Sequence, residues 1–411
     1  MYGFGGVGVA GFEGFCQSVV VRVPGGVGLG GVVGVVQGVL DCHDMWRSRL
    51  VESGGAWVLE VRGVGVVSAG GCVERVDARG VGGEELRGLV EGVAGEVGRG
   101  LDPVGGVMVR VVWFDRGGEP GRLLVVAHHL VVDGVSWRVV VRDLAVAWEA
   151  VSAGREVVLP GVGTSFREWA GLLVEEAGSG VRSGELPVWV GLLGAPAVVV
   201  GDRPLDVVRD TVGSARSLSW RVPVGVAGVL LSRVPSLFFC GVDEVLLSGL
   251  VSVLGGPVLV DVEGHGRRES VVGVDLSRTV GWFTSVHPVR LDPGRGLGAG
   301  GVLKRVKEQM RSVPDGGAGF GVLRYLDGVA GGVLAGLPGA SVAFNYLGRF
   351  AAGRDADWEP AVEMGALSGG ADERMPLGHA LTVTAVTRDL PDGPELTLTC
   401  VWPEGVLAEG W

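Results

Sequence analysis

Residues 128–137, His-His-Leu-Val-Val-Asp-Gly-Val-Ser-Trp, join an apolar run to a segment with helical spacing. The apolar run, Leu123 to Ala127, predicts a buried strand. The dipeptide Asp133-Gly134 predicts a turn, after which the pattern from Trp137 onward favours a helix. Two adjacent histidines therefore lie where a strand ends in a loop, which is a common place for a rigid scaffold to present functional side chains.

Either histidine of this stretch can take part in proton transfer, because an imidazole gains and loses a proton near neutral pH. Asp133, four residues after His129, can form a buried salt bridge or cap the next helix without contacting a substrate. The alternatives are a metal pair and a structural histidine. No third histidine or cysteine lies nearby in the sequence, and spacing alone does not separate catalysis from a structural role.

Length and composition narrow the class of protein. With 411 residues the chain is too long for one simple core, so we expect two domains or two lobes. Hydrophobic residues make up 47% of the chain and charged residues 20%, which predicts a large core and little disorder. The net charge of −11 argues against a nucleic acid as partner.

Five cysteines are scattered along the chain without a CxxC spacing. This usage predicts a reducing, cytoplasmic environment and offers neither a disulfide framework nor a zinc site. Residues 23–40 carry no charge, but they begin with Val-Pro-Gly-Gly and remain rich in glycine, and no basic flank precedes an inner end. We therefore do not expect them to span a membrane.

Hydrophobic periodicity predicts strands alternating with helices through most of the chain. In the first half the strongest patterns are strands at 18–23, 56–61 and 107–114 and helices at 28–40 and 84–97. Thr164-Ser165-Phe166-Arg167-Glu168 is a capping-box pattern that begins another helix. Residues 178–204, rich in Gly, Ser and Pro, are expected to cross from one lobe to the other.

A second polar cluster follows the apolar strand expected at 258–262. It reads Glu263-Gly264-His265-Gly266-Arg267. A carboxylate at a strand end can act as acid or base when burial raises its pKa. The alternative is an exposed turn that contains a Glu–Arg pair.

Five motifs together resemble those of the epimerization domains of nonribosomal peptide synthetases, which are members of the condensation-domain superfamily. In chain order they are His128-His129…Asp133-Gly134…Ser136-Trp137, then Glu263-Gly264-His265-Gly266-Arg267, then Arg278-Thr279-Val280-Gly281-Trp282-Phe283-Thr284, then Pro314…Gly317-Ala318-Gly319-Phe320-Gly321, and finally Phe344-Asn345-Tyr346-Leu347-Gly348. The His-His motif alone indicates only the superfamily, whereas the four later motifs are more specific. The resemblance covers nearly the whole chain.

The resemblance implies an α/β fold of two chloramphenicol-acetyltransferase-like lobes, arranged as a V-shaped pseudo-dimer with a tunnel at the seam. Residues 1–177 would form the N-terminal lobe with the His-His motif. Residues 178–411 would form the C-terminal lobe with Glu263 and the later motifs. His129 and Glu263 would then face each other across the tunnel.

The activity implied is epimerization, L to D at the α-carbon, of an aminoacyl or peptidyl thioester held on the phosphopantetheine arm of a carrier protein. An α-proton beside a thioester is weakly acidic, so inversion needs a base on one face, a proton donor on the other and stabilisation of the enolate. His129 and Glu263 would exchange the protons. The implied partners are an upstream peptidyl carrier protein domain and the condensation domain of the following module. We expect no cofactor of its own, no metal, no nucleic acid and no membrane partner.

Several other residues are expected to line or support the site: His128, Gly134, Ser136, Trp137 and His265. Asp133 and Arg278 are expected to form a structural pair that joins the lobes. Asn345 and Tyr346 are candidates to line the site and to bond the enolate oxygen. For His265 the alternative is a solvent-facing side chain. The remaining histidines are expected to be structural: His43, His287 and His379.

The chain departs from the family pattern at several places. Cys42 stands where a histidine is common, and Thr384 replaces a frequent asparagine. The usual Pro-Ile-Gln opening and the final helix are missing, so we expect a fragment truncated at both ends. Two alternatives stay open. One is a peptide-bond-forming condensation domain, which uses His129 but does not need Glu263, and the other is a catalytically silent docking module.

Overall fold

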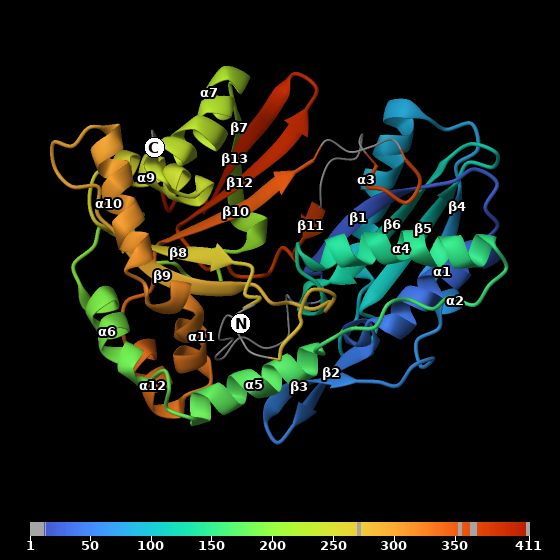
Figure 1. Ribbon diagram of the computed structural model, residues 1–411, viewed down its shortest axis with the longest axis horizontal. Coiled ribbons are helices and arrows are strands. Elements are labelled where there is room, and N and C mark those ends of the chain that lie inside the picture. The colour runs from blue at the N-terminus through green and yellow to red at the C-terminus, as the bar shows by residue number, and fades with distance from the viewer. Residues whose placement is uncertain (1–11, 13, 269–272, 352–355, 362–367, 408–411) are drawn as a thin grey trace.

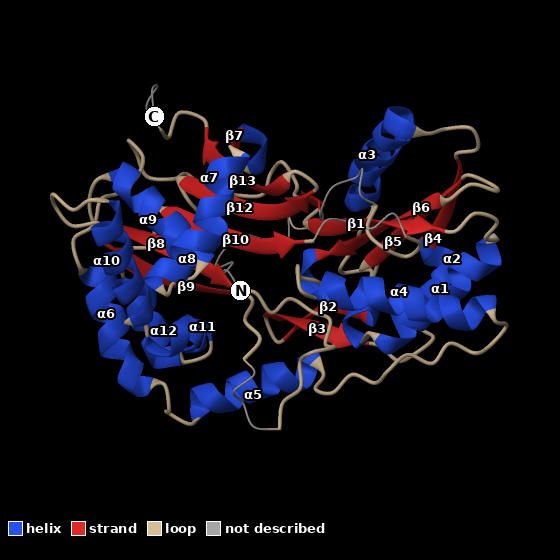
Figure 2. Ribbon diagram, turned by 45° about the horizontal axis from the view of Figure 1, so that its top comes forward, coloured by secondary structure: helices blue, strands red, loops and turns tan. Residues whose placement is uncertain are grey.

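The computed structural model describes residues 12, 14–268, 273–351, 356–361 and 368–407. These residues form two lobes that lie side by side, each built on a β-sheet with helices packed against it (Figures 1 and 2). The predicted two-lobed α/β architecture is therefore confirmed.

The sheet of the first lobe has the strand order β11-β1-β6-β5-β4 among the described residues. Strands β4 and β5 are parallel, and the other neighbours are antiparallel. Its strands are β1 (Cys16–Val23), β4 (Val73–Asp77), β5 (Val109–Asp115), β6 (Gly121–His128) and β11 (Ser368–Gly370). A separate hairpin consists of β2 (Ser48–Ser53) and β3 (Ala56–Val61).

Both faces of this sheet are covered, because successive residues of a strand point to opposite faces. In β6, Leu123, Val125 and Ala127 belong to a core cluster shared with α1 (Leu29–Cys42) and α4 (Ser136–Ser152). Leu124 and Val126 belong to the cluster of α3 (Gly83–Arg99) on the other face. The whole of β6 is buried, as its continuous apolar run predicts. The short helix α2 (Ala69–Cys72) precedes β4.

A late segment of the chain returns to the first sheet. Strand β11 pairs with the beginning of β1, and the Trp358 N–H donates to the carbonyl of Arg22 at 2.7 Å. Trp358 is 3% exposed and belongs to the core cluster of α1 and α4. Residues far beyond position 178 thus complete the edge of the sheet that carries the His-His motif (Figure 1).

The sheet of the second lobe has the order β7-β13-β12-β10-β8-β9. Strands β8, β10 and β12 run parallel, and the outer pairs are antiparallel. Its strands are β7 (Ala215–Val222), β8 (Val258–Gly264), β9 (Ser285–Leu291), β10 (Val342–Phe350), β12 (Leu381–Leu390) and β13 (Gly393–Pro403).

Helices cover one face of the second sheet and leave the other face polar. The helices of this lobe are α6 (Leu186–Gly194), α7 (Val224–Gly228), α8 (Val234–Phe238), α9 (Val242–Leu254), α10 (Ala299–Arg311), α11 (Ala318–Tyr325) and α12 (Gly328–Ala335). Val260, Val262 and Phe344 pack into the core under these helices. Alternation then turns Glu263 and Asn345 to the opposite face, at the level where β8 and β10 are neighbours.

The connection between the lobes contains two helices. The helix expected from the capping box is α5 (Phe166–Gly178), in which Ser165 Oγ accepts a hydrogen bond from the Glu168 N–H. Residues 178–204, expected to cross between the lobes, contain α6, whose Trp189 is fully buried in the second core. Figure 2 shows α5 running beneath both lobes.

No single helix among the described residues is both long and apolar enough to cross a membrane. One bent pair, Val224–Phe238 with Val242–Leu254, meets the length and composition together.

Candidate active site

The two adjacent histidines have different surroundings. His128 is fully buried; its Nε2 contacts the carbonyl of Phe12 at 2.8 Å, and its Nδ1 accepts from the Leu130 N–H. Burial lowers its pKa to about 4, so it is neutral at pH 7. His129 instead contacts two aromatic rings, with centroid distances of 4.5 Å to Phe15 and 4.6 Å to Trp282, and these two rings also contact each other at 5.6 Å. Burial also lowers the pKa of His129, opposed by backbone carbonyls and by Asp133.

Sequence reasoning missed Gln17, which contacts His129 directly. The Nε2 atoms of the two side chains are 2.8 Å apart, and Gln17 Oε1 accepts from the indole N–H of Trp137 at 2.9 Å. Gln17 occupies the same face of β1 as Val19 and Val21. A polar residue at the first position of an otherwise apolar face was the available signal.

Asp133 is the centre of a buried hydrogen-bond network. Its Oδ1 accepts from the N–H and the hydroxyl of Ser136, both at 2.7 Å, and its Oδ2 accepts from the Phe283 N–H at 3.1 Å. Arg267 Nη2 lies 3.1 Å from Asp133 Oδ1. The Ser136 Oγ also accepts from the Gly281 N–H at 3.1 Å and lies 2.9 Å from the Gly281 carbonyl oxygen. The His-His loop is thereby fixed to the loop that follows Glu263.

The expected pairing of Asp133 with Arg278 is wrong. Arg267 is the cation on Asp133, and its guanidinium also lies 4.0 Å from the ring centroid of Phe283. Arg278 donates instead to both oxygens of Asp143, at 2.9 Å. Asp143 lies about two helical turns into α4. Arg267 follows the strand end that faces the His-His loop, so it reaches Asp133 first. The alternative of a Glu263–Arg267 pair in an exposed turn is excluded by the same contacts.

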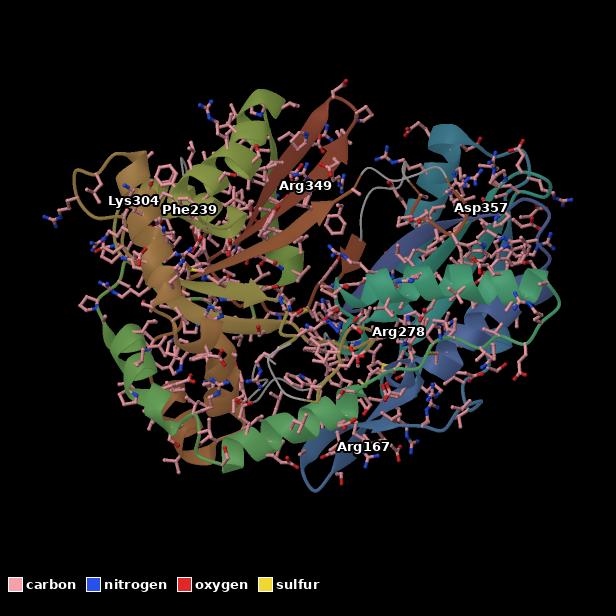
Figure 3. The ribbon with its side chains drawn as sticks, in the orientation of Figure 1. Arg167, Phe239, Arg278, Lys304, Arg349 and Asp357 are labelled. Carbon is pink, nitrogen blue, oxygen red and sulfur yellow. The ribbon has the colours of Figure 1, made fainter. Side chains whose placement is uncertain are left out.

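Arg278 still joins distant parts of the chain, because it lies where the two lobes meet (Figure 3). Its partner Asp143 also accepts from His43 Nε2, at 2.8 Å. His43 is 1% exposed, which agrees with its expected structural role. Gly134, by contrast, lies exposed in the turn before α4, and Trp137 is buried against Trp46.

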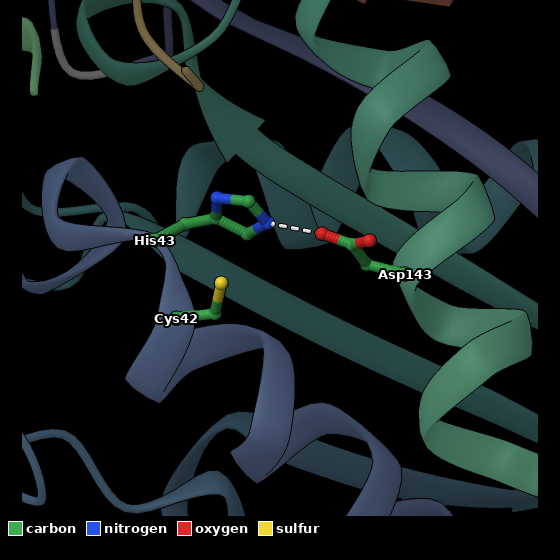
Figure 4. Close-up of side chains that lie close together, drawn as sticks. All are labelled: Cys42, His43 and Asp143. Carbon is green, nitrogen blue, oxygen red and sulfur yellow. Dashed lines mark hydrogen bonds and ion pairs between the residues drawn. The ribbon is translucent and has the colours of Figure 1, made fainter. Parts of the chain in front are cut away.

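Within the described part of the chain, one group of metal-ligating side chains lies close together: Cys42, His43 and Asp143 (Figure 4). Their ligand atoms lie within 4.8 Å of one another. The guanidinium of Arg278 on the same carboxylate opposes a second cation there. Burial raises the pKa of the Cys42 thiol, which keeps it neutral and a poor ligand. The chemistry of this group therefore favours a structural cluster over a metal site.

Glu263 is the ionisable group whose properties best suit proton transfer. Its carboxyl lies at the end of β8, and its Oε2 accepts from Asn345 Nδ2 at 2.5 Å. Burial raises its pKa from 4.5 to about 7, an effect that nearby Asp261 reinforces and His379 opposes. His379 itself is hydrogen-bonded to Asp261 at 2.8 Å. At neutral pH the carboxyl is therefore present in both protonation states.

The structure brings Asn345 to Glu263 but does not bring Tyr346 there. The Tyr346 hydroxyl lies 3.1 Å from Thr387 Oγ1, and its ring packs with the core on the helix side of the sheet. Asn345 opposes Thr384 in β12, which opposes Thr399 in β13. This row of polar residues continues from Glu263 across the sheet.

The loop after Glu263 has a fixed shape. Gly266 has a φ of +66°, and a Cβ on it would lie 1.7 Å from the Phe283 carbonyl oxygen. His265 is exposed, and its Nδ1 accepts from the Arg267 N–H at 3.1 Å. Of the two expectations for His265, the solvent-facing side chain is the one observed. The turn at Gly266 directs Arg267 inward to Asp133.

The sequence and the fold match known proteins. The family model described as "Condensation domain" matches residues 11–193 and 253–374. A linear gramicidin synthase of Brevibacillus parabrevis is 36% identical over 340 residues, which are 81% of this chain and 7% of that protein. The chain therefore spans only a small part of the curated relatives it matches.

Two solved structures illustrate the range of the match. The epimerization domain from the third module of tyrocidine synthetase B has a TM-score of 0.79 at 25% identity, covering 97% of this chain and 88% of that one. The first condensation domain of the CDA synthetase has a TM-score of 0.65 at 18% identity, with coverages of 96% and 88%, which shows a shared fold. With the family model matching most of its length, the chain belongs to the condensation-domain family.

Proposed function

We propose that this protein epimerizes the α-carbon of an aminoacyl or peptidyl thioester carried on the phosphopantetheine arm of a carrier protein. The observation that carries the proposal is Glu263, a partly buried carboxyl at a strand end with a pKa raised to about 7. Peptide-bond formation does not require an acid–base carboxyl at this position. The similarity to the tyrocidine synthetase epimerization domain supports the same function.

In the proposed reaction one group removes the α-proton, which leaves an enolate, and a second group returns a proton to the opposite face. Glu263 is one group and His129 the other. Two groups with separated pKa values can each be in the protonation state that its step needs. Asn345 donates one N–H to Glu263, and its amide carries a second N–H. We assign that second N–H to the enolate oxygen.

The buried Asp133–Arg267 pair would fix the positions of His129 and Glu263 relative to each other. Asp133 follows His129 by four residues, and Arg267 follows Glu263 by four. The ion pair therefore links the two loops close to both groups without taking part in the reaction. His128, Ser136 and Trp137 would support the His129 loop.

The proposed partners are an upstream peptidyl carrier protein domain and the condensation domain of the following module. We propose that residues 1–177 make up most of the N-terminal lobe and residues 178–411 most of the C-terminal lobe, with residues 356–361 and β11 joined to the first sheet. The substrate arm would enter a tunnel at the seam. The reaction as proposed needs no cofactor beyond the carrier's phosphopantetheine.

The test uses a carrier protein loaded separately with L- and D-aminoacyl groups. Wild-type protein should exchange the α-proton for deuterium and invert both enantiomers. Glu263→Gln should retain the fold and lower inversion by about 10²- to 10⁴-fold, the range typical of a general acid–base group. Glu244→Gln is the matched control, because Glu244 is a buried, hydrogen-bonded carboxyl of α9 outside the site.

The alternatives give different results in the same assay. A condensation domain would form an amide between two loaded carrier proteins and leave the α-carbon unchanged. A silent docking module would do neither. Wild-type inversion rates in Glu263→Gln would remove the assignment of Glu263.

A further inference from the structure

The hydrogen bonds of Gln17 determine which way its side-chain amide is turned. An indole N–H can only donate, so the atom of Gln17 that lies 2.9 Å from Trp137 Nε1 must be the carbonyl oxygen. The amide NH₂ then points to His129 Nε2, 2.8 Å away. Because the NH₂ group can only donate, His129 Nε2 must accept with its lone pair.

We infer that Gln17 is a positioning residue, which holds His129 as the neutral Nδ1–H tautomer and occupies the Nε2 lone pair. A neutral imidazole carries one proton, and the hydrogen bond made by one ring nitrogen determines where that proton resides. Trp137 donates to Gln17, and Gln17 donates to His129. Because Nε2 is the acceptor of the second hydrogen bond, the single proton of the neutral ring must be on Nδ1.

The packing around the imidazole restricts the rotation that would exchange its two nitrogens. Phe15 is stacked on it with an interplanar angle of 10°, and Trp282 contacts it at a tilt of 49°, next to Phe15. The carbonyls of His129 and Val132 lie near the ring, but the buried Nδ1 makes no hydrogen bond of good geometry among the described residues. The Gln17 contact therefore decides the ring's tautomer.

The charged and titratable groups around His129 do not override this assignment. Asp133 favours the imidazolium, but burial outweighs it and lowers the pKa of His129. His128 is neutral, with its pKa lowered to about 4. If His129 Nε2 were protonated, its N–H would face the N–H of the Gln17 amide, and neither could accept. The Gln17 amide therefore also disfavours the imidazolium.

This inference deepens the proposed function and rests on it for its mechanistic meaning. When His129 takes the α-proton, the Cα–H bond breaks, its electron pair stays on the enolate, and the proton reaches Nε2. The Gln17 NH₂ must leave Nε2 before that step. Turning the amide would break its bond to Trp137, so Gln17 restrains His129 until the substrate arrives.

The direct test is the tautomer of His129 in the whole protein. Long-range ¹H–¹⁵N correlation spectra of protein labelled in its histidine rings distinguish the Nδ1–H, Nε2–H and imidazolium forms. The chain has six histidines, and loss of one set of signals in His129→Ala identifies the ring. We expect the Nδ1–H form in the wild type near neutral pH. An Nε2–H form or an imidazolium would overturn the inference, without need of any Gln17 variant.

Substituting Gln17 with glutamate changes the donor into an acceptor at nearly constant size. One carboxylate oxygen can still accept from Trp137, and the other must accept from His129 Nε2. We expect His129 to gain a proton on Nε2, with at least about a tenfold increase in its proton affinity, because a hydrogen-bonded opposite charge favours the charged form. Trp137→Phe should give a mixture of tautomers, since nothing then orients the amide.

The matched control is Gln37→Glu, because Gln37 also bridges two groups, the Ala69 N–H and the Val67 carbonyl, and its hydrogen bonds within the described residues involve no histidine. It should leave the His129 signals unchanged. Unchanged signals in Gln17→Glu would overturn the inference. The deuterium-exchange assay is separate: a wild type with the Nδ1–H tautomer and no α-exchange would refute the proposed function and leave the role of Gln17 standing.

Discussion

At the scale of single residues, proton transfer depends on where the protons of Glu263 and His129 are. The two groups together need one proton, whichever enantiomer reacts, because one must be a base while the other is an acid. The pKa of Glu263 is raised to about 7 and that of His129 is lowered, so the pair carries this one proton between the two pKa values. Above pH 7 the proton is lost.

This predicts that inversion in both directions decreases above about pH 7, by up to tenfold per pH unit, as Glu263 ionises. If Glu263 alone acted as a base, inversion would instead increase through the same range, because only the carboxylate would be active. Initial rates on L- and D-loaded carrier protein across the neutral range measure the sign. A rise with pH in both directions would exclude His129 as the second group.

The raised pKa of Glu263 also affects stability. The folded protein binds this proton more tightly than the unfolded chain, whose carboxyl keeps a pKa near 4.5. The stabilisation is therefore full below pH 4.5 and is lost as pH rises through about 7. Glutamine does not titrate, so the free energy of unfolding of Glu263→Gln should rise relative to the wild type by up to about 3 kcal/mol between acidic and mildly alkaline pH.

Denaturant unfolding of the two proteins at a series of pH values measures this difference. Glu176→Gln is a control of opposite sign, because a hydrogen bond from Arg268 lowers the pKa of Glu176. The wild type should gain stability over that variant as pH rises from acid. A difference between Glu263→Gln and the wild type that does not depend on pH would show that Glu263 has an ordinary pKa.

The sequence predicted some residues of the candidate site and not others. Motif matching identified Glu263 and Asn345, and the structure joins them by a hydrogen bond. Gln17 went unnoticed because its partner His129 lies 112 positions away. One polar residue on an otherwise apolar strand face gives no sign of which distant side chain is its partner.

At the scale of elements, the loops after β6 and β8 are joined through Asp133 and Arg267. Both side chains are buried, and Asp133 also binds the backbone N–H groups of Ser136 and Phe283. Removing one partner leaves a buried charge, so we expect Asp133→Ala and Arg267→Ala each to cost about 3–5 kcal/mol. The double variant should cost less than the sum, with a coupling of about 0.5–3 kcal/mol.

The control cycle pairs Asp133→Ala with Arg278→Ala. Arg278 binds Asp143 and shares no partner with Asp133 in the described contacts, so these two losses should add within about 0.5 kcal/mol. Denaturant unfolding of the six proteins measures both cycles. Strong coupling in the control cycle, with none between Asp133 and Arg267, would restore the pairing expected from the sequence.

Element prediction succeeded where hydrophobic periodicity is long and failed for short or pairing-dependent segments. The helix expected at 84–97 is α3, and the strand expected at 258–262 is β8. Strand β11 has three residues, Ser-Gly-Gly, and is defined only by its hydrogen bonds to β1. Such a segment has no periodicity of its own, so its sequence carries no signal.

At the scale of the whole molecule, the two lobes are joined by more than the connection at α5. The chain returns from the second sheet to pair with β1, through Trp358, Glu359 and Ala361. Composition could not predict this return, because it depends on contacts across more than 300 positions. A boundary at 177/178 therefore divides the sequence but not the structure, because the first sheet contains residues from both sides of it.

The last prediction tests this link through Trp358. Its ring is 3% exposed, lies 5.6 Å from that of Trp148, and belongs to the core of the first lobe. Trp358→Ala should cost about 3–5 kcal/mol, as expected for removing a buried large aromatic side chain. Because the Arg22 and Val20 backbone groups bond to residues 358–361, amide protection in β1 should fall, far from the substitution in sequence. Hydrogen exchange of peptides covering residues 16–23 measures this. Trp220→Ala is the control, since Trp220 is 62% exposed on the edge strand of the second sheet, and it should leave β1 unchanged. Loss of protection confined to residues 356–361 would mean that the returning segment lies on the first lobe without stabilising it.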